Sequence, residues 1–238
     1  MAPNSMTPAE IVSGLRDADL PSRREFLQRS AEAGGGALAL AFVGSNAALA
    51  GHDPYDDAVD ADDGTDLEVL QFALTLEHLE NAFYRDVGGR FDESDYRRAA
   101  FLRGFGDRVR SEVAETVRAI GAHEQTHVDF LTDVIDGNFE EEPVAEACYD
   151  FGVDDIDEFA DVARVLENTG VTAYTGSIAD VDTAAYSTAG ATIATVEARH
   201  ATYLNFLTGR DPVPDAFDTP RTRKEVFDAA SGFIAECE

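Results

Sequence analysis

The sequence predicts an all-α fold: a four-helix bundle with a long crossover between its second and third helices and a shorter fifth helix near the C-terminus. Two observations predict this fold. Four long segments repeat apolar or small residues at alternating spacings of four and three, which is typical of helices that bury one face. In addition, no window of more than a few residues shows the period-two alternation of a β-strand.

The first 50 residues are organised like an export signal. Residues 22–27 (SRREFL) resemble the twin-arginine signal, and an apolar run at 37–43 and the small-residue pattern at 48–50 (ALA) follow it. A short amphipathic helix with an incidental arginine pair is the alternative interpretation. We expect residues 1–50 to be a twin-arginine signal peptide and the mature protein to be extracellular or attached to the cell surface.

The charge of the chain limits its partners. It has 18 basic and 47 acidic residues, a formal charge of −29, and a single lysine, Lys224. Such a surface repels nucleic acid and anionic membranes, so we expect neither as a partner. No other segment approaches the roughly 20 apolar residues of a membrane helix, so we expect a soluble mature chain. An acidic, lysine-poor composition favours a halophilic, haloarchaeal source, where salt screens the self-repulsion.

The bundle is expected to occupy residues 65–208, after an acidic linker at 51–64. Its first helix starts at a capping box, Thr65 with Glu68, and ends at the glycine pair after residue 87. A short helix is expected within 92–105, and residues 138–154, which contain Pro143, are long enough to cross the bundle. The other long helices are expected at 107–136, before Gly137, at about 154–179 and at about 182–207.

Residues 209–238 are predicted to form an extension with a short fifth helix. Thr219 and Pro220 are interpreted as its N-cap and first residue, and it is expected to end near Ala235. Apolar residues are expected to dock it on the bundle: Phe217, Val226, Phe227, Phe233 and Ile234. Cys148 and Cys237 form no metal-binding motif, and either a disulfide between them or two free buried thiols is compatible with the sequence.

Two of the helices carry a Glu-x-x-His pattern on the face predicted to be buried. Glu124 and His127 lie in one seven-residue row, and Glu197 and His200 lie in another. A spacing of three places the carboxylate and the imidazole on the same helical face, where they can bind one ion. A single such pair is usually exposed to solvent, but two pairs on matching buried faces indicate a metal site.

The other two long helices each place a glutamate on the buried face, followed seven residues later by a tyrosine. Glu77 precedes Tyr84, and Glu167 precedes Tyr174. The chain therefore repeats one unit twice: a helix with glutamate and tyrosine, then a helix with Glu-x-x-His. Four carboxylates and two neutral imidazoles carry a charge of −4 in a bundle interior, and two divalent cations would neutralise it.

This pattern resembles the ferritin-like superfamily, in which two helices each give one glutamate and two give Glu-x-x-His. Residues 76–84 (LEHLENAFY) and 214–218 (PDAFD) resemble its exported branch, which includes desiccation-related proteins. The resemblance implies two Fe or two Mn ions that react with peroxide or dioxygen, as in a ferroxidase, a manganese catalase-like enzyme or a protector against oxidative stress. The implied ligands are Glu77, Glu124, His127, Glu167, Glu197 and His200, with Glu124 and Glu197 as bridges.

Several alternatives stay open. Glu80, near His78, is a second candidate for the ligand position of Glu77, and the two tyrosines are either core aromatics or partners of the ligands. His123 is expected to be structural or exposed, and His52 receives no role. The ions could instead only stabilise a protective bundle, or be stored without catalysis, and a homo-oligomer is compatible with either function.

Overall fold

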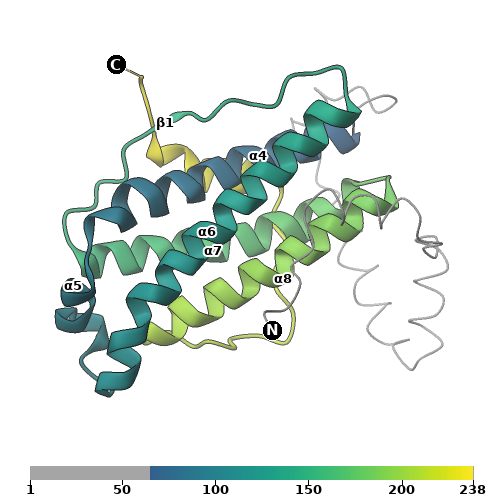
Figure 1. Cartoon of the computed structure of the whole chain (residues 1–238). Coiled ribbons are helices and arrows are strands. Elements are labelled where there is room, and N and C mark those ends of the chain that lie inside the picture. The colour runs from purple at the N-terminus through teal and green to yellow at the C-terminus, as the bar shows by residue number, and fades with distance from the viewer. Residues whose placement is uncertain (1–64, 238) are drawn as a thin grey trace, which may run out of the picture.

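A computed structural model of the chain describes residues 65–237, so the predicted signal peptide and acidic linker lie outside the described residues. The described part confirms the all-α bundle. Figure 1 shows its four long helices side by side: α4 (Thr65–Ala82), α6 (Asp107–Asn138), α7 (Ile156–Ser177) and α8 (Ala184–Leu207). Within this part of the chain, no helix has both the length and the apolar character needed to cross a membrane.

The helices are arranged as two pairs. α4 packs chiefly against α6, and α7 packs chiefly against α8. The connection from α6 to α7 runs along the outside of the bundle from one end to the other, as the teal trace in Figure 1 shows. This is the predicted long crossover. Each pair consists of a helix with a single candidate glutamate, α4 or α7, followed in the chain by a helix with Glu-x-x-His, α6 or α8.

The end of α4 differs from a plain helix. The helix widens into a π-helical stretch, Phe83–Val87, and a 3₁₀ turn, Gly88–Arg90, follows. The short helix expected within 92–105 is divided into α5 (Glu93–Arg98) and a 3₁₀ turn (Ala100–Leu102). The division occurs because Ala99 leaves the helical region, with φ −51° and ψ 139°.

Two predicted helix boundaries were wrong. α6 continues through Gly137 to Asn138, where the Asn138 side chain donates to the Val134 carbonyl at 2.6 Å. α7 begins later than predicted, at Ile156, because the Asp155 side chain accepts hydrogen bonds from the next helical backbone N–H groups and acts as the N-cap. The glycine therefore remains helical, and a capping aspartate defines the start of α7.

The start of the fifth helix was also predicted wrongly. α9 spans Arg223–Ala230, and its N-cap is Thr222, which forms a reciprocal capping box with Glu225. The pair Thr219 and Pro220 lies in the connection before it. A threonine followed three residues later by a glutamate satisfies two free N–H groups, whereas the Thr-Pro pair offers no such reciprocal bond.

The extension docks on α7 through fewer apolar residues than expected. Val226 is fully buried, and Phe233 packs partly buried against the core. Phe217, Phe227 and Ile234 are exposed by 60%, 44% and 43%, so their predicted docking role was wrong. Phe227 lies on α9, which can turn only one narrow face to the bundle, whereas Phe217 and Ile234 lie outside this helix.

The chain end is joined to the crossover. Strand β2 (Ile234–Ala235) pairs antiparallel with β1 (Cys148–Tyr149), with Cys148 opposite Ala235. These two-residue strands were not predicted from the sequence. Next to them Cys148 and Cys237 form a disulfide, which resolves the alternative left open above. The bond closes a chain segment with a sequence separation of 89 residues and fixes the extension on the crossover.

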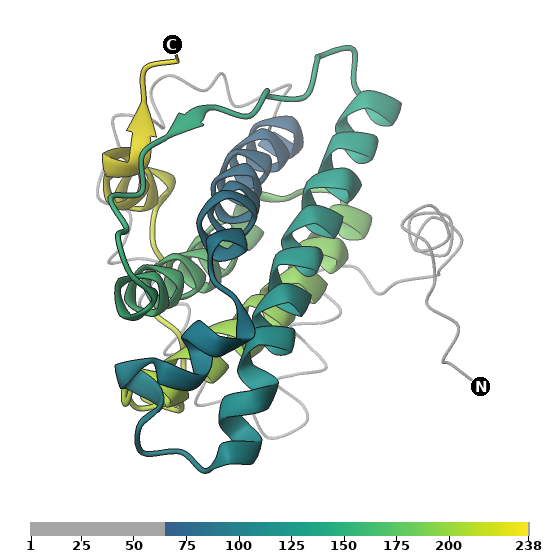
Figure 2. The same cartoon turned by 60° about the vertical axis from the view of Figure 1, so that its left-hand side comes forward.

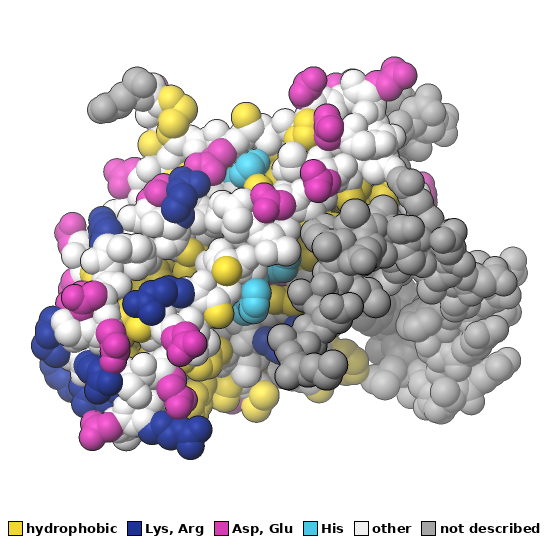
Figure 3. Space-filling view, in the orientation of Figure 1, with side chains coloured by type: hydrophobic (Ala, Val, Ile, Leu, Met, Phe, Trp, Pro, Cys, Tyr) yellow, Lys and Arg dark blue, Asp and Glu magenta, His cyan; other side chains and the backbone are white. Residues whose placement is uncertain are grey.

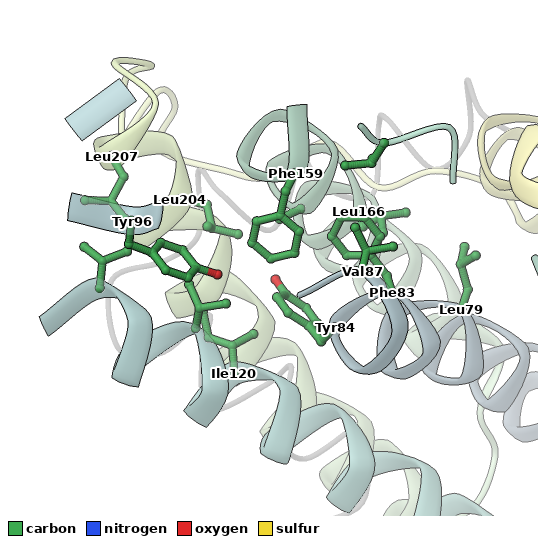
Figure 4. Close-up of a cluster of buried hydrophobic side chains, with 14 of the residues drawn as sticks. Leu79, Phe83, Tyr84, Val87, Tyr96, Ile120, Phe159, Leu166, Leu204 and Leu207 are labelled. Atoms are coloured by element: carbon green, nitrogen blue, oxygen red, sulfur yellow. The ribbon is translucent and has the colours of Figure 1, made fainter. Parts of the chain in front are cut away.

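The apolar core is divided into two clusters with a charged layer between them. On α6, Val113, Val117 and Ile120 belong to one cluster, and Leu131 and Val134 belong to the other. The first cluster is rich in aromatic residues, and Figure 4 shows Phe159 at its middle, stacked on Phe83 with the ring centroids 5.1 Å apart. Glutamates and histidines at the centre of the seams occupy the layer between the clusters.

Candidate metal centre

The four predicted glutamates converge in the charged layer. Glu77 on α4, Glu124 on α6, Glu167 on α7 and Glu197 on α8 are each fully buried, with no exposed surface. Their helices place them there because each glutamate occupies the middle of a row of residues that faces the bundle interior, and the hydrophobic effect buries the apolar members of that row. All four carboxylates thus enter the same interior volume from four different helices.

Both predicted histidines point their Nδ1 atoms into this volume. His127 Nδ1 lies 3.0 Å from Glu124 Oε2 and 3.1 Å from Glu77 Oε2. His200 Nδ1 lies 3.0 Å from Glu124 Oε1 and 3.1 Å from Glu167 Oε2. Each imidazole therefore contacts the carboxylate of its own pair of helices, and both contact Glu124.

These six residues form two overlapping groups of ligand atoms. One group comprises Glu77, Glu124, His127 and Glu197, and the other comprises Glu124, Glu167, Glu197 and His200. Within each group the ligand atoms lie within 4.8 Å of one another. Glu124 and Glu197 belong to both groups. Each of the two groups could therefore hold a metal ion.

The tyrosines connect the two halves of the repeat. The Tyr84 hydroxyl donates to Glu167, and the Tyr174 hydroxyl donates to Glu77. Each tyrosine thus orients the glutamate of the other half. Burial and the neighbouring carboxylates raise the pKa of both hydroxyls well above 10, so both stay protonated and act as donors.

Glu80 is a fifth buried carboxylate beside the centre. It is 3% exposed, and its Oε2 atom has no hydrogen-bond partner among the described residues. Its counterpart in the second half of the repeat is Gly170, where an added Cβ would lie 3.0 Å from Glu80 Oε1. The missing side chain provides the space that Glu80 occupies. Glu77, and not Glu80, belongs to the two ligand groups.

His123 is exposed, as expected, but it also contacts the centre. Its Nδ1 atom lies 2.9 Å from Nε2 of His200, with the two rings nearly parallel. Sequence reasoning missed this contact because His123 lies outside the buried row of α6 and meets His200 only across the interface with α8. In the second half the equivalent position is Val196, so the two histidine ligands differ in their outer partners.

The pKa values show that the buried carboxylates repel one another when no cation lies between them. Burial, reinforced by the charges of neighbouring glutamates, raises the pKa of Glu197 and Glu80 well above the ordinary value. Burial opposes the charging of both histidines, but adjacent carboxylates outweigh it and raise the pKa of His127 to about 10 and of His200 to about 9. Glu197 accepts no hydrogen bond on either oxygen from the described residues.

Comparison with known proteins agrees with this geometry. A search of curated proteins found no match to the chain. A model of the ferritin-like domain matches residues 65–210, which include all four bundle helices and both ligand groups. The chain therefore belongs to the ferritin-like domain family.

Proposed function

We propose that this metal-binding ferritin-like protein holds two Fe or two Mn ions in a carboxylate-bridged centre. Glu77 with His127 and Glu167 with His200 would each serve one ion, and Glu124 and Glu197 would bridge them. The observation that carries the proposal is the overlap of the two ligand groups in these bridging carboxylates. Oxygen-rich sites with imidazole favour iron or manganese over structural zinc.

The donor set fits such ions on charge as well as on geometry. Four ligand carboxylates and two neutral imidazoles carry −4 in a site with no exposed carboxylate surface. Two divalent cations would balance that charge, and they would also bind the Glu197 oxygens, neither of which accepts a hydrogen bond from the described residues. The tyrosine hydroxyls hold the terminal glutamates in place, which is how ligands around a metal are usually oriented.

A route to the surface supports reactivity with a small molecule. A groove of about 390 Å³ lies between α6 and α8, and its lining includes His127 and His200. Figure 3 shows histidine side chains reaching the surface on the face it displays. When bound, the ions would supply open positions for peroxide or dioxygen. We infer a ferroxidase, a catalase-like enzyme or a related protector against oxidation.

A stabilising role is the second candidate. The ligands come from all four long helices, so bound ions would link the bundle without any reaction. This role suits the exported, desiccation-related branch that residues 76–84 resemble. Export by the twin-arginine route and a halophilic source are part of the same proposal. The disulfide between Cys148 and Cys237 supports an oxidising compartment.

Metal quantitation tests the proposal. Protein folded in its own host should contain close to two Fe or Mn per chain, and Glu124→Gln and His127→Ala should each lose metal, because a missing ligand weakens binding. Glu115→Gln, at an exposed position of the same helix, is the matched control. Less than about one ion per chain, unchanged in these variants, contradicts the proposal.

Rapid mixing of the metal-loaded protein with Fe(II) or with hydrogen peroxide separates the two candidate functions. An oxidoreductase turns over one of these substrates, and Glu124→Gln abolishes the turnover. A stabilising centre shows no turnover with either substrate, yet the protein still loses stability when a chelator removes the ions.

A further inference from the structure

A second cavity lies outside the candidate metal centre. It has a volume of about 590 Å³ and lies between the end of α4, α5 and α6. Buried aromatic and apolar side chains, including Tyr84, Tyr96 and Val117, form its floor, and exposed polar residues form its rim. Its volume lies in the usual range for pockets that bind small molecules.

The local backbone creates this space. The π-helical stretch Phe83–Val87 widens the end of α4, and such stretches are frequent at functional sites. Gly88, Gly89 and Gly121 line the cavity without side chains. At Gly121 an added Cβ would lie 2.9 Å from Tyr84 Cβ, so this glycine is required for α6 to approach the tyrosine that forms the floor.

The charge around the cavity contrasts with that of the chain. Residues 85–118 contain eight arginines and seven acidic residues, a net charge of +1, whereas the whole chain carries −29. Figure 3 shows the Lys and Arg side chains gathered at the end of the molecule that α5 occupies. A local excess of arginine in so acidic a protein favours a role in binding an anion at this end.

The arginines at the rim are not equally available. Arg85 is engaged by Asp86 and Glu146 at 2.7 and 2.8 Å. Arg90 donates to the Val153 carbonyl but has no acidic partner among the described residues, and Arg118 has no hydrogen bond or ion pair with them. Within residues 65–237, the Arg118 guanidinium therefore has all its donors available for a ligand.

The floor beside Arg118 adds a free polar group. Tyr96 is 2% exposed, and its hydroxyl makes no hydrogen bond within residues 65–237. Burial raises the pKa of this hydroxyl, and the nearby charge of Arg118 partly opposes the shift. Figure 4 shows the Tyr84 and Tyr96 rings on either side of Phe159, with their hydroxyl ends directed toward the space between them.

From this arrangement we propose that the cavity binds a small organic carboxylate. The guanidinium of Arg118 receives the carboxylate, because the planar fork of arginine matches its two oxygens, and Arg90 also lines the cavity. The Tyr84 and Tyr96 rings and Val117 contact an apolar or aromatic body. A simple inorganic anion offers no such body and binds more weakly.

None of the six candidate metal ligands lines the cavity, but one side chain, Tyr84, connects the two sites. The Tyr84 ring lines the cavity, and its hydroxyl donates to Glu167 of the centre. A bound carboxylate would thus lie one tyrosine away from the candidate ligands. The binding itself needs no metal, so its test is independent of the proposal for the centre.

Calorimetric titration of the whole chain with benzoate, benzamide and inorganic phosphate tests the inference. Benzoate should bind more tightly than neutral benzamide and than phosphate. Arg118→Gln should weaken benzoate about tenfold or more, since it removes a charge-assisted pair. Arg108→Gln, on the same helix with an 89% exposed side chain paired to Glu112, should leave benzoate binding unchanged.

Two further variants keep the test decisive if Arg118→Gln folds poorly. Arg118→Lys retains the charge but loses the fork, and Tyr96→Phe loses only the hydroxyl, so each should weaken benzoate to a smaller degree. The inference is overturned if benzoate and benzamide bind alike, if benzoate fails to bind at millimolar concentration, or if the Arg118 variants bind it as the parent chain does.

Discussion

Replacing Glu197 with glutamine should change stability in opposite directions with and without metal. The carboxylate is fully buried, accepts no hydrogen bond from the described residues and has a raised pKa because of burial and the surrounding glutamates. In chelator-treated protein at a pH above the raised pKa of this carboxyl, a neutral amide removes a buried negative charge that repels the neighbouring glutamates, so Glu197→Gln should stabilise the fold there. In metal-loaded protein the same change removes a bridging ligand, so it should destabilise the fold.

The destabilisation of metal-loaded protein by Glu197→Gln can be calculated from the expected loss of ion affinity. A weakening of about 10- to 100-fold corresponds to roughly 1.4 to 2.8 kcal/mol. For a domain of this size that lowers Tm by about 3 to 11 °C. Thermal unfolding of the parent chain and Glu197→Gln, each loaded and chelator-treated, measures both signs. Glu115→Gln, which removes an exposed carboxylate, should shift neither curve by more than about 0.5 kcal/mol.

The pH dependence gives a second check on the same cluster. Glu197 and Glu80 have raised pKa values, so their contribution to stability is complete below 4.5 and is lost as the pH rises through their folded values. His127 and His200 contribute fully below 6.5 and lose that stability as the pH rises through about 10 and about 9. Chelator-treated protein should therefore lose stability from about pH 5 to about pH 10.

Metal-loaded protein should instead lose stability as the pH falls, because protonation of the ligands releases the ions. The reasoning about the centre is refuted if Glu197→Gln shifts Tm in the same direction in both states. It is also refuted if chelator-treated and loaded protein share one pH profile.

Three further changes have distinct expected outcomes. Tyr174→Phe removes a hydroxyl that donates to a buried carboxylate, and should cost about 1.5 to 3 kcal/mol in a denaturant titration while keeping metal stoichiometry; no loss would show that the bond contributes nothing. Gly121→Ala places a Cβ 2.9 Å from Tyr84 Cβ and should destabilise by about 1 to 3 kcal/mol, whereas Gly137→Ala, in open space on the same helix, should stabilise by up to about 1 kcal/mol. Replacing both cysteines with serine should cost about 2 to 4 kcal/mol, given the 89-residue separation, and leave metal content unchanged; lost metal would show that the disulfide shapes the centre.

The sequence was sufficient for the fold class and for the faces of the helices. Rows such as Val113, Val117 and Ile120 repeat at spacings of four and three residues, and the hydrophobic effect buries such a row in any compact arrangement. The same periodicity places Glu124 and His127 on the buried face. Sequence reasoning failed where two start signals lie close together, as at Thr219 and Pro220, because the reciprocal capping box of Thr222 and Glu225 begins the helix three residues later.

Contacts between helices were decided only by the tertiary structure. That Tyr84 donates to Glu167, and that His123 reaches His200, depends on how far one helix slides and turns against another, which no single helix encodes. The cavity between the end of α4, α5 and α6 depends likewise on the π-helical stretch Phe83–Val87 and on the close approach of α6 at Gly121. Periodicity along one helix thus determines which side chains are buried, whereas packing between helices determines which of them meet.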